Sequence, residues 1–117
     1  MQKPQIIDVA IVGAGFGGLC AAIRLRESGA VQSLAILERS HEVGGTWRDN
    51  IYPGCACDVP SHLYSFSFAP NTRWTRPYPQ QHEIQDYILR VTDTYALRPL
   101  VRFNSEVLAM HWLADQQ

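Results

Sequence analysis

The stretch IIDVAIVGAGFGG at residues 6–18 decides the fold that this chain can adopt. Residues 6–12 are rich in β-branched side chains, which is typical of a buried strand, and glycines follow at once. Residues 17–28 carry apolar side chains at helical spacing, and Gly29 is a natural C-terminal stop. Residues 33–38 read as a second strand. This order predicts a βαβ unit with two parallel strands and a right-handed crossover.

The glycines at residues 13–18 fit the pattern G-x-G-x-x-G between the expected strand and the expected helix. Gly13 permits a tight turn, Gly15 lets the backbone approach a pyrophosphate, and Gly18 lets the helix pack close to the strand. Glu38 ends the second strand, where a carboxylate can accept hydrogen bonds from ribose hydroxyls and would repel a 2′-phosphate. The pattern favours dinucleotide binding at the helix N-terminus over a purely structural turn. FAD and NAD both remain open on these residues.

The composition indicates one small globular domain. The chain has 117 residues, 46% of them hydrophobic, and a net charge of −1, so neither a nucleic acid nor a membrane surface is expected as a partner. The apolar run at residues 6–12 is too short to span a bilayer and lacks a signal-peptide pattern. An odd number of cysteines without a leader favours free thiols and a cytoplasmic location.

The second half of the sequence has a different texture. Residues 40–79 are rich in glycine, proline and aromatic side chains, and a loop of this length is expected to have a function rather than to serve as a flexible linker. Residues 82–96 are predicted to form an amphipathic helix, and residues 101–103 and 107–112 to form short strands. We expect part of the parallel sheet to lack a partner strand.

A metal site is not predicted. Cys55 and Cys57 flank one residue, but zinc normally takes four ligands at a recognisable spacing, and His41 and His62 are near only in sequence. Cys20 lies within the first expected helix and reads as a small packing residue.

A second glycine pair separates this chain from a simple NAD domain. Residues 44–47, GGTW, follow Glu38 closely, where a simple NAD domain would proceed to its next crossover helix. With this motif the chain resembles class B flavoprotein monooxygenases, the flavin-containing and especially the Baeyer–Villiger monooxygenases. The matching residues are 12–19 (VGAGFGGL), Glu38, 44–47 with Asn50, 52–54 (YPG), 57–61 (CDVPS), 64–68 (YSFSF), 78–79 (YP), 83–84 (EI), and 102–104 (RFN) with Val107.

The resemblance covers almost the whole chain, and residues 44–68 discriminate the family better than the glycine loop does. It implies a Rossmann-like FAD-binding domain of the glutathione-reductase type, with an incomplete parallel sheet and an extended insertion. It also implies that residues 1–117 are the N-terminal FAD-binding part of a longer enzyme, because no second glycine loop for NADPH follows Glu38. We therefore expect a fragment without an NADPH-binding domain.

The resemblance assigns candidate roles by position. Residues 13–18 would hold the FAD pyrophosphate, Glu38 would hold the ribose, Val107 would meet adenine through its backbone, and Tyr64 would contact the flavin region. The candidate cofactor-binding residues are Gly13, Gly15, Phe16, Gly17, Gly18, Glu38, Arg39, Gly45, Thr46, Trp47, Asp58, Tyr64 and Val107. Ala56, Cys57 and Asp58 would lie on the NADP side, although some Baeyer–Villiger enzymes carry an arginine at the position of Ala56.

Asp58 is the candidate catalytic residue. A carboxylate near a reduced flavin could orient the nicotinamide carboxamide, whereas the alternative is an aspartate that caps the turn before Val59-Pro60. The aromatic residues Trp47, Tyr52, Tyr64 and Trp74 could likewise pack in the core or stack on a cofactor.

The resemblance also implies a reaction. In the complete enzyme NADPH would reduce FAD, and the reduced flavin would use O₂ to transfer one oxygen atom to a ketone or to a soft nitrogen or sulfur nucleophile. The chain alone is expected to bind FAD weakly and to lack turnover. The alternatives are a flavin oxidase or dehydrogenase domain and a non-catalytic FAD- or nucleotide-binding module. The sequence leaves the substrate and the oligomeric state open.

Overall fold

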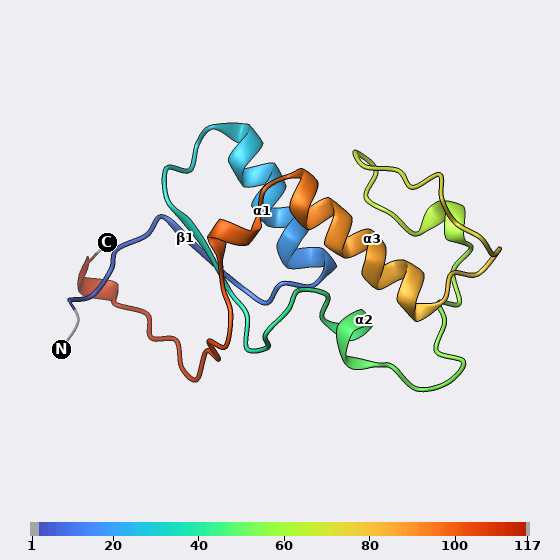
Figure 1. The fold of residues 1–117 in the computed structure, drawn as a ribbon. Coiled ribbons are helices and arrows are strands. Elements are labelled where there is room, and N and C mark those ends of the chain that lie inside the picture. The colour runs from blue at the N-terminus through green and yellow to red at the C-terminus, as the bar shows by residue number, and fades with distance from the viewer. Residues whose placement is uncertain (1–2, 117) are drawn as a thin grey trace.

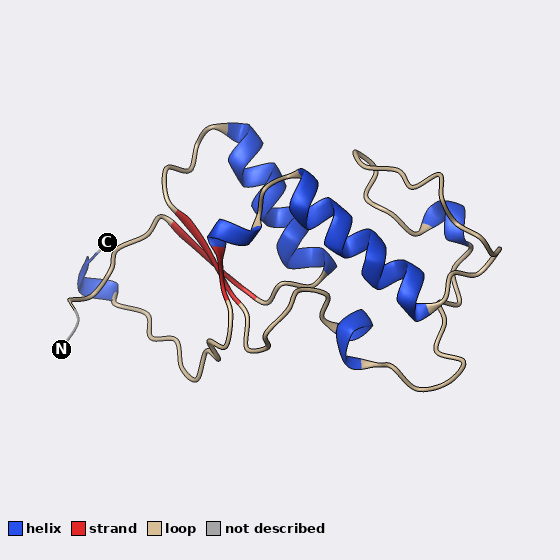
Figure 2. Ribbon diagram, viewed as in Figure 1, coloured by secondary structure: helices blue, strands red, loops and turns tan. Residues whose placement is uncertain are grey.

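The computed structural model describes residues 3–116 and confirms an α/β fold (Figure 1). The strands β1 (Val9–Val12), β2 (Leu34–Leu37) and β3 (Val101–Arg102) form a parallel sheet in the order β1–β2–β3, which Figure 2 shows as one layer. The register pairs Ile11 with Ile36, and Ile36 with Val101. Paired residues of parallel strands point to the same face, so these three side chains build one apolar face of the sheet.

The helix α1 (Phe16–Ser28) forms the crossover between β1 and β2, as predicted. Its residues Leu19 and Ile23 are buried, because this side of the helix packs into the core. Gly29 ends the helix in the left-handed conformation, with φ of 70°, and its N–H donates to the Arg26 carbonyl. Glycine adopts this conformation at little cost, which explains the stop.

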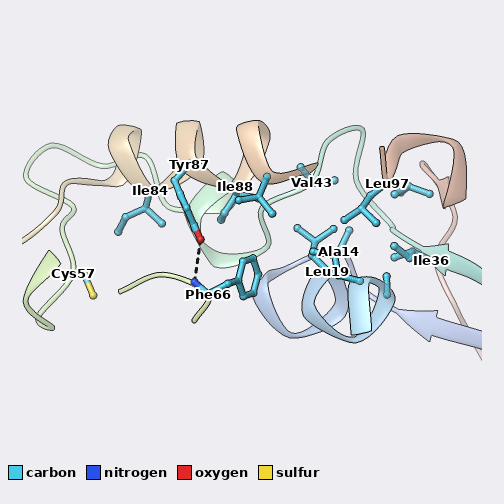
Figure 3. Packing of buried hydrophobic residues seen from close by; sticks show 14 residues of the cluster. Ala14, Leu19, Ile36, Val43, Cys57, Phe66, Ile84, Tyr87, Ile88 and Leu97 are labelled. Carbon is cyan, nitrogen blue, oxygen red and sulfur yellow. Dashed lines mark hydrogen bonds between the residues drawn. The ribbon is translucent and has the colours of Figure 1, made fainter. Parts of the chain in front are cut away.

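The aromatic insertion, residues 40–79, contains little regular structure but is held in place by contacts with the rest of the domain. It includes the one-turn helix α2 (Thr46–Asp49) and the 3-10 turn η1 (Ser61–Leu63). The Tyr87 hydroxyl accepts a hydrogen bond of 3.0 Å from the Phe66 N–H and donates to the Ala69 carbonyl, as Figure 3 shows in part. The insertion is therefore part of the packed domain, as its aromatic content predicted.

The helix α3 (Gln81–Thr94) joins this insertion to the Rossmann unit. In Figures 1 and 3 it lies beside α1, and side chains from both helices meet in the core. The buried cluster combines Ala14, Leu19, Ala22, Ile23, Ile36, Val43, Cys57, Phe66, Ile84, Tyr87, Ile88, Val91, Leu97 and Val101. The turn η2 (Arg98–Leu100) then leads directly into β3.

The predicted strand at residues 107–112 is wrong. The chain leaves the sheet at Asn104, which has a φ of 53°, and the Ser105 N–H donates to the Glu38 carbonyl at 2.9 Å. Beyond this turn the residues run without a partner strand to the 3-10 turn η3 (Ala114–Gln116), and Leu108 is 87% exposed. The apolar run at residues 107–112 suggested a strand, but after the turn at Asn104 these residues pair with no strand of the described sheet.

The first strand is shorter than the predicted residues 6–12, because Ile6 and its neighbours stand free of the sheet. Within the described residues β1 pairs with β2 alone, so its outer edge has no partner, as expected. Val12 remains 56% exposed on the face of the sheet opposite Ile11.

Candidate cofactor-binding site

A cavity of about 420 Å³ opens at the carboxyl ends of β1 and β2. In open α/β sheets this crevice is where ligands bind. It is lined by Val12, Gly13, Ala14, Gly15, Leu37, Glu38, Arg39, Gly45, Thr46, Arg48, Asp49, Ser105, Glu106 and Val107. Segments far apart in the sequence therefore converge on one site.

The glycine loop forms the first wall of this cavity, and its three pattern glycines have different reasons to be glycine. Gly13 has a φ of 97°, which a side chain would strain. A Cβ on Gly18 would lie 1.9 Å from the Gly13 carbonyl oxygen, so the packing of α1 on β1 excludes one. A Cβ on Gly15 would meet only the Gly45 Cα, at an ordinary 3.8 Å. The fold therefore needs Gly13 and Gly18, whereas Gly15 keeps space open in the cavity.

The N-terminus of α1 faces the same loop. Gly15 occupies the N-cap position, no described side chain caps the helix, and the first turn carries no acidic residue. The leading N–H groups of a helix lack partners within the helix, and together with the helix dipole they favour an anion. This end of the cavity suits a phosphate group.

The second glycine pair forms a second wall of the cavity and contacts the first wall directly. The Gly44 N–H donates to the Ala14 carbonyl at 2.9 Å. Gly45 has a φ of 55°, and a Cβ built on it would lie 3.2 Å from the Gly15 Cα. The second glycine pair thus allows two backbone segments to approach each other at the edge of the cavity.

Two glutamines of α3 hold this second wall in place. The Gln85 side-chain amide donates to the Val43 carbonyl at 2.8 Å, and the Gln81 amide donates to the Trp47 carbonyl. Gly44 has a φ of 128°, which a side chain would strain, and a Cβ there would also displace the Gln85 side-chain amide. The helix α3 therefore positions part of the site.

Glu38 lies at the end of β2, where the sequence predicted it, and is only 3% exposed. Its Oε1 accepts a hydrogen bond of 3.0 Å from the Ala14 N–H. Its Oε2 accepts one of 2.7 Å from the Ser40 N–H and lies 3.2 Å from Arg48 Nη1. Glu38 therefore anchors the glycine loop in addition to facing the cavity.

Sequence reasoning missed several residues of the cavity. Arg48 lines it and pairs with Glu38, although the pattern G-x-G-x-x-G carries no signal for an arginine at this position. Ser105 and Glu106 also line it, because the Ser105 N–H binds the Glu38 carbonyl after the chain leaves β3. The charge of Arg48 next to the GGTW motif was the one available hint.

A second hollow of about 330 Å³ lies at the start of α1 and is lined by Phe16, Gly17 and residues 63–66. The Trp47 indole N–H donates to the Tyr64 hydroxyl at 3.0 Å, and the rings of Phe16 and Tyr64 meet edge to face with centroids 5.3 Å apart. Burial raises the pKa of the Tyr64 phenol, although the hydrogen bond with Trp47 lowers it, so the phenol is protonated at neutral pH.

The predicted residues fall into three groups. Seven of them meet in the first cavity: Gly13, Gly15, Glu38, Arg39, Gly45, Thr46 and Val107. Phe16, Gly17 and Tyr64 line the second hollow, with Trp47 bound to Tyr64, while Gly18 packs the helix onto the strand.

The residues predicted for the NADP side line neither hollow. Ala56 is exposed and forms an isolated bridge with Gln80, Cys57 is buried, and Asp58 is exposed. Cys57 belongs to the buried cluster against which Tyr64 packs.

Within residues 3–116, histidine, cysteine, aspartate and glutamate side chains do not gather in any group of three or more that could hold a metal ion. Among the helices described there, none combines the length and the apolar character needed to cross a membrane.

Comparison with known proteins gives consistent matches. The family model of the NAD(P)-binding Rossmann-like domain matches residues 11–80. A Baeyer–Villiger monooxygenase of Streptomyces coelicolor is 58% identical over 98% of this chain and 22% of its own length. A Baeyer–Villiger monooxygenase of Pseudomonas aeruginosa is 50% identical over 89% of this chain and 20% of its own length.

Solved structures give the same result. A cyclohexanone monooxygenase mutant from Rhodococcus, bound to NADP+, matches 97% of this chain and 22% of its own with a TM-score of 0.90 and 36% identity. The OTEMO complex with FAD and NADP matches the same shares with a TM-score of 0.87 and 30% identity. These matches confirm the resemblance, and the chain spans about a fifth of the length of the relatives. The chain belongs to the family of NAD(P)-binding Rossmann-like domains.

Proposed function

We propose that residues 1–117 are the FAD-binding module of an NADPH-dependent flavoprotein monooxygenase of the Baeyer–Villiger type. The observation that carries this proposal is Gly15, because neither its backbone conformation nor its packing requires a glycine. It lies where the first cavity meets the uncapped start of α1, and a side chain there would occupy the space of a bound diphosphate.

The residues of the site fit FAD. The glycine loop and the α1 N-terminus would hold the pyrophosphate, Glu38 would accept hydrogen bonds from the adenosine ribose, and Val107 would lie beside the adenine. The second hollow, with Tyr64 at its wall and Trp47 bound to it, would take the flavin side. A ligand passing the start of α1 would reach both hollows, since Gly15 lines the first and Phe16 the second.

The bound flavin supplies the redox chemistry, and the chain supplies binding and orientation. The Tyr64 hydroxyl, protonated and fixed by Trp47, presents a polar group at the edge of an apolar hollow. The proposed substrate is a ketone, or a nucleophilic nitrogen or sulfur compound, with O₂ as the oxygen donor and NADPH as the reductant. These partners belong to the whole enzyme.

The first experiment measures flavin content and product. We expect the complete gene product to be yellow, to release FAD on denaturation, and to form an oxygenated product with NADPH and O₂. A yellow protein that converts NADPH only to hydrogen peroxide would indicate an oxidase. A colourless protein that fails to take up added FAD would refute flavin binding.

Asp58 can be tested separately, because its exposed side chain contributes little to folding. We expect Asp58→Asn to keep flavin content and thermal stability and to slow flavin reduction by NADPH, measured anaerobically by stopped flow. Asp86→Asn, an exposed aspartate on α3, is the matched control. An unchanged rate of reduction in Asp58→Asn would leave the turn-capping role as the explanation of this residue.

We also propose a cytoplasmic location. In the described residues all three cysteines, Cys20, Cys55 and Cys57, are free thiols, which supports a reducing compartment.

A further inference from the structure

We propose that Arg48 is a positioning residue for the cofactor: it occupies one carboxylate oxygen of Glu38 and so leaves the other oxygen for a ribose hydroxyl. This inference rests on the proposed function, because it names the residue that prepares Glu38 for the adenosine half of the ligand. It concerns a side chain that no glycine motif predicts.

Arg48 is held from three sides. Its Nη1 donates to the Glu42 carbonyl at 2.7 Å and lies 3.2 Å from the Glu38 Oε2, and its Nε donates to the Asp49 Oδ1 at 2.9 Å. Arg48 belongs to the one-turn helix α2, and its side chain is only 11% exposed. A guanidinium with this many partners presents a fixed geometry rather than a mobile charge.

The two oxygens of Glu38 are occupied unequally. Oε2 is paired with the Ser40 N–H at 2.7 Å and with Arg48 at 3.2 Å, whereas Oε1 accepts from the Ala14 N–H alone. An ionised carboxylate oxygen offers about two acceptor positions. Oε2 therefore carries both a hydrogen bond and the ion pair, whereas Oε1 carries one hydrogen bond and keeps a position for a donor from a ligand in the cavity that Glu38 lines.

The charge of Arg48 also stabilises the Glu38 carboxylate. A carboxylate buried to this degree is costly without a partner cation. Arg39, another arginine of the cavity, is exposed at its rim, whereas Arg48 is buried beside Glu38. Without Arg48, Oε2 keeps the Ser40 N–H but loses its partner cation, so backbone hydrogen bonds alone hold Glu38 in the orientation in which Oε1 receives the ribose. Lysine at position 48 would keep a charge but lose the fork that binds several partners at once.

The test compares two ligands that differ by one hydroxyl group. The complete gene product, freed of flavin, is titrated with ADP and with 2′-deoxyADP by calorimetry. Wild type should prefer ADP by about 10- to 100-fold, the scale of one hydrogen bond to a charged group. Arg48→Met should remove this preference, and Arg48→Lys should reduce it. Arg24→Met, which removes an exposed arginine paired with Glu27, should leave it intact.

The outcomes separate the two proposals. If Arg48 contributes to stability alone, Arg48→Met should lower the melting temperature and weaken the binding of ADP and 2′-deoxyADP equally. The ratio of the two affinities would then be unchanged, and this result would overturn the inference. If Arg48→Met does not fold, the same ratio measured in Arg48→Lys decides, and an unchanged ratio again overturns it. A wild-type protein that binds no ADP would refute the proposed function itself. A preference that survives Glu38→Gln would remove the ribose role of Glu38 and, with it, the role of Arg48.

Discussion

The two walls of the first cavity are built from glycines in different ways. The first wall, residues 13–15, is tied to the sheet: the Gly13 N–H donates to the Leu37 carbonyl at 2.8 Å, and the Ala14 N–H to Glu38. The second wall, residues 43–48, belongs to no strand of the described sheet: the Gly44 N–H donates to the Ala14 carbonyl, and the side chains of Gln81 and Gln85 on α3 donate to the Trp47 and Val43 carbonyls.

The difference shows how far the local sequence determines the position of each wall. A loop that connects a strand to a helix is positioned by both elements, so a glycine pattern is enough to predict where the loop lies. A loop placed by side chains 40 residues further on depends on tertiary contacts that no local pattern encodes. The following predictions test this contrast, beginning with the largest expected effect.

The first wall should fail when α1 is forced away from β1. We expect Gly18→Val to lower the free energy of unfolding by about 3 kcal/mol, because its Cβ would collide with the Gly13 carbonyl oxygen. Denaturant unfolding of the complete gene product measures this loss. Gly17→Ala is the control, since a Cβ there meets nothing within 4 Å, and equal stability losses in both variants would contradict the packing argument.

The second wall should become less stable when α3 no longer donates a hydrogen bond to it. We expect Gln85→Ala to cost about 1–2 kcal/mol, because the Val43 carbonyl loses its side-chain donor, and to increase the rate of FAD release. Asp86→Ala on the exposed side of the same helix should change neither quantity. A Gln85→Ala protein that retains FAD as long as wild type does would show that the second wall positions itself.

The contact between the second wall and the second hollow should give the smallest effect. Tyr64→Phe keeps the ring against Phe16 but removes the acceptor of the Trp47 indole N–H, so we expect a loss of about 1 kcal/mol. Thermal unfolding measures the loss, and the flavin absorption spectrum reports whether the hydroxyl lies near the flavin. An unchanged spectrum would place Tyr64 outside the flavin site.

Sequence reasoning predicted the parts of the site that follow from a local rule. The βαβ unit, the stop at Gly29 and the position of Glu38 each depend on neighbours within one turn or one strand, and the structure has them as predicted. The resemblance pointed to the GGTW motif, and the structure brings Gly45 against Gly15.

The remaining features depend on contacts distant in sequence. Arg48 and Gln85 act through the residues that folding brings next to them, so their residue types alone did not assign them a role. The error at residues 107–112 has the same origin. A short apolar run forms a strand only where it can pair with a neighbouring strand, and the turn at Asn104 takes the chain away from the sheet.

The most direct measurement counts FAD molecules released per chain by wild type and by Gly15→Val. The variant should keep its stability, because the Cβ at position 15 meets only an ordinary contact with Gly45, and should lose nearly all bound FAD, because the side chain fills the space next to the α1 N-terminus. A stable Gly15→Val protein that still carries as much FAD as wild type would contradict the account.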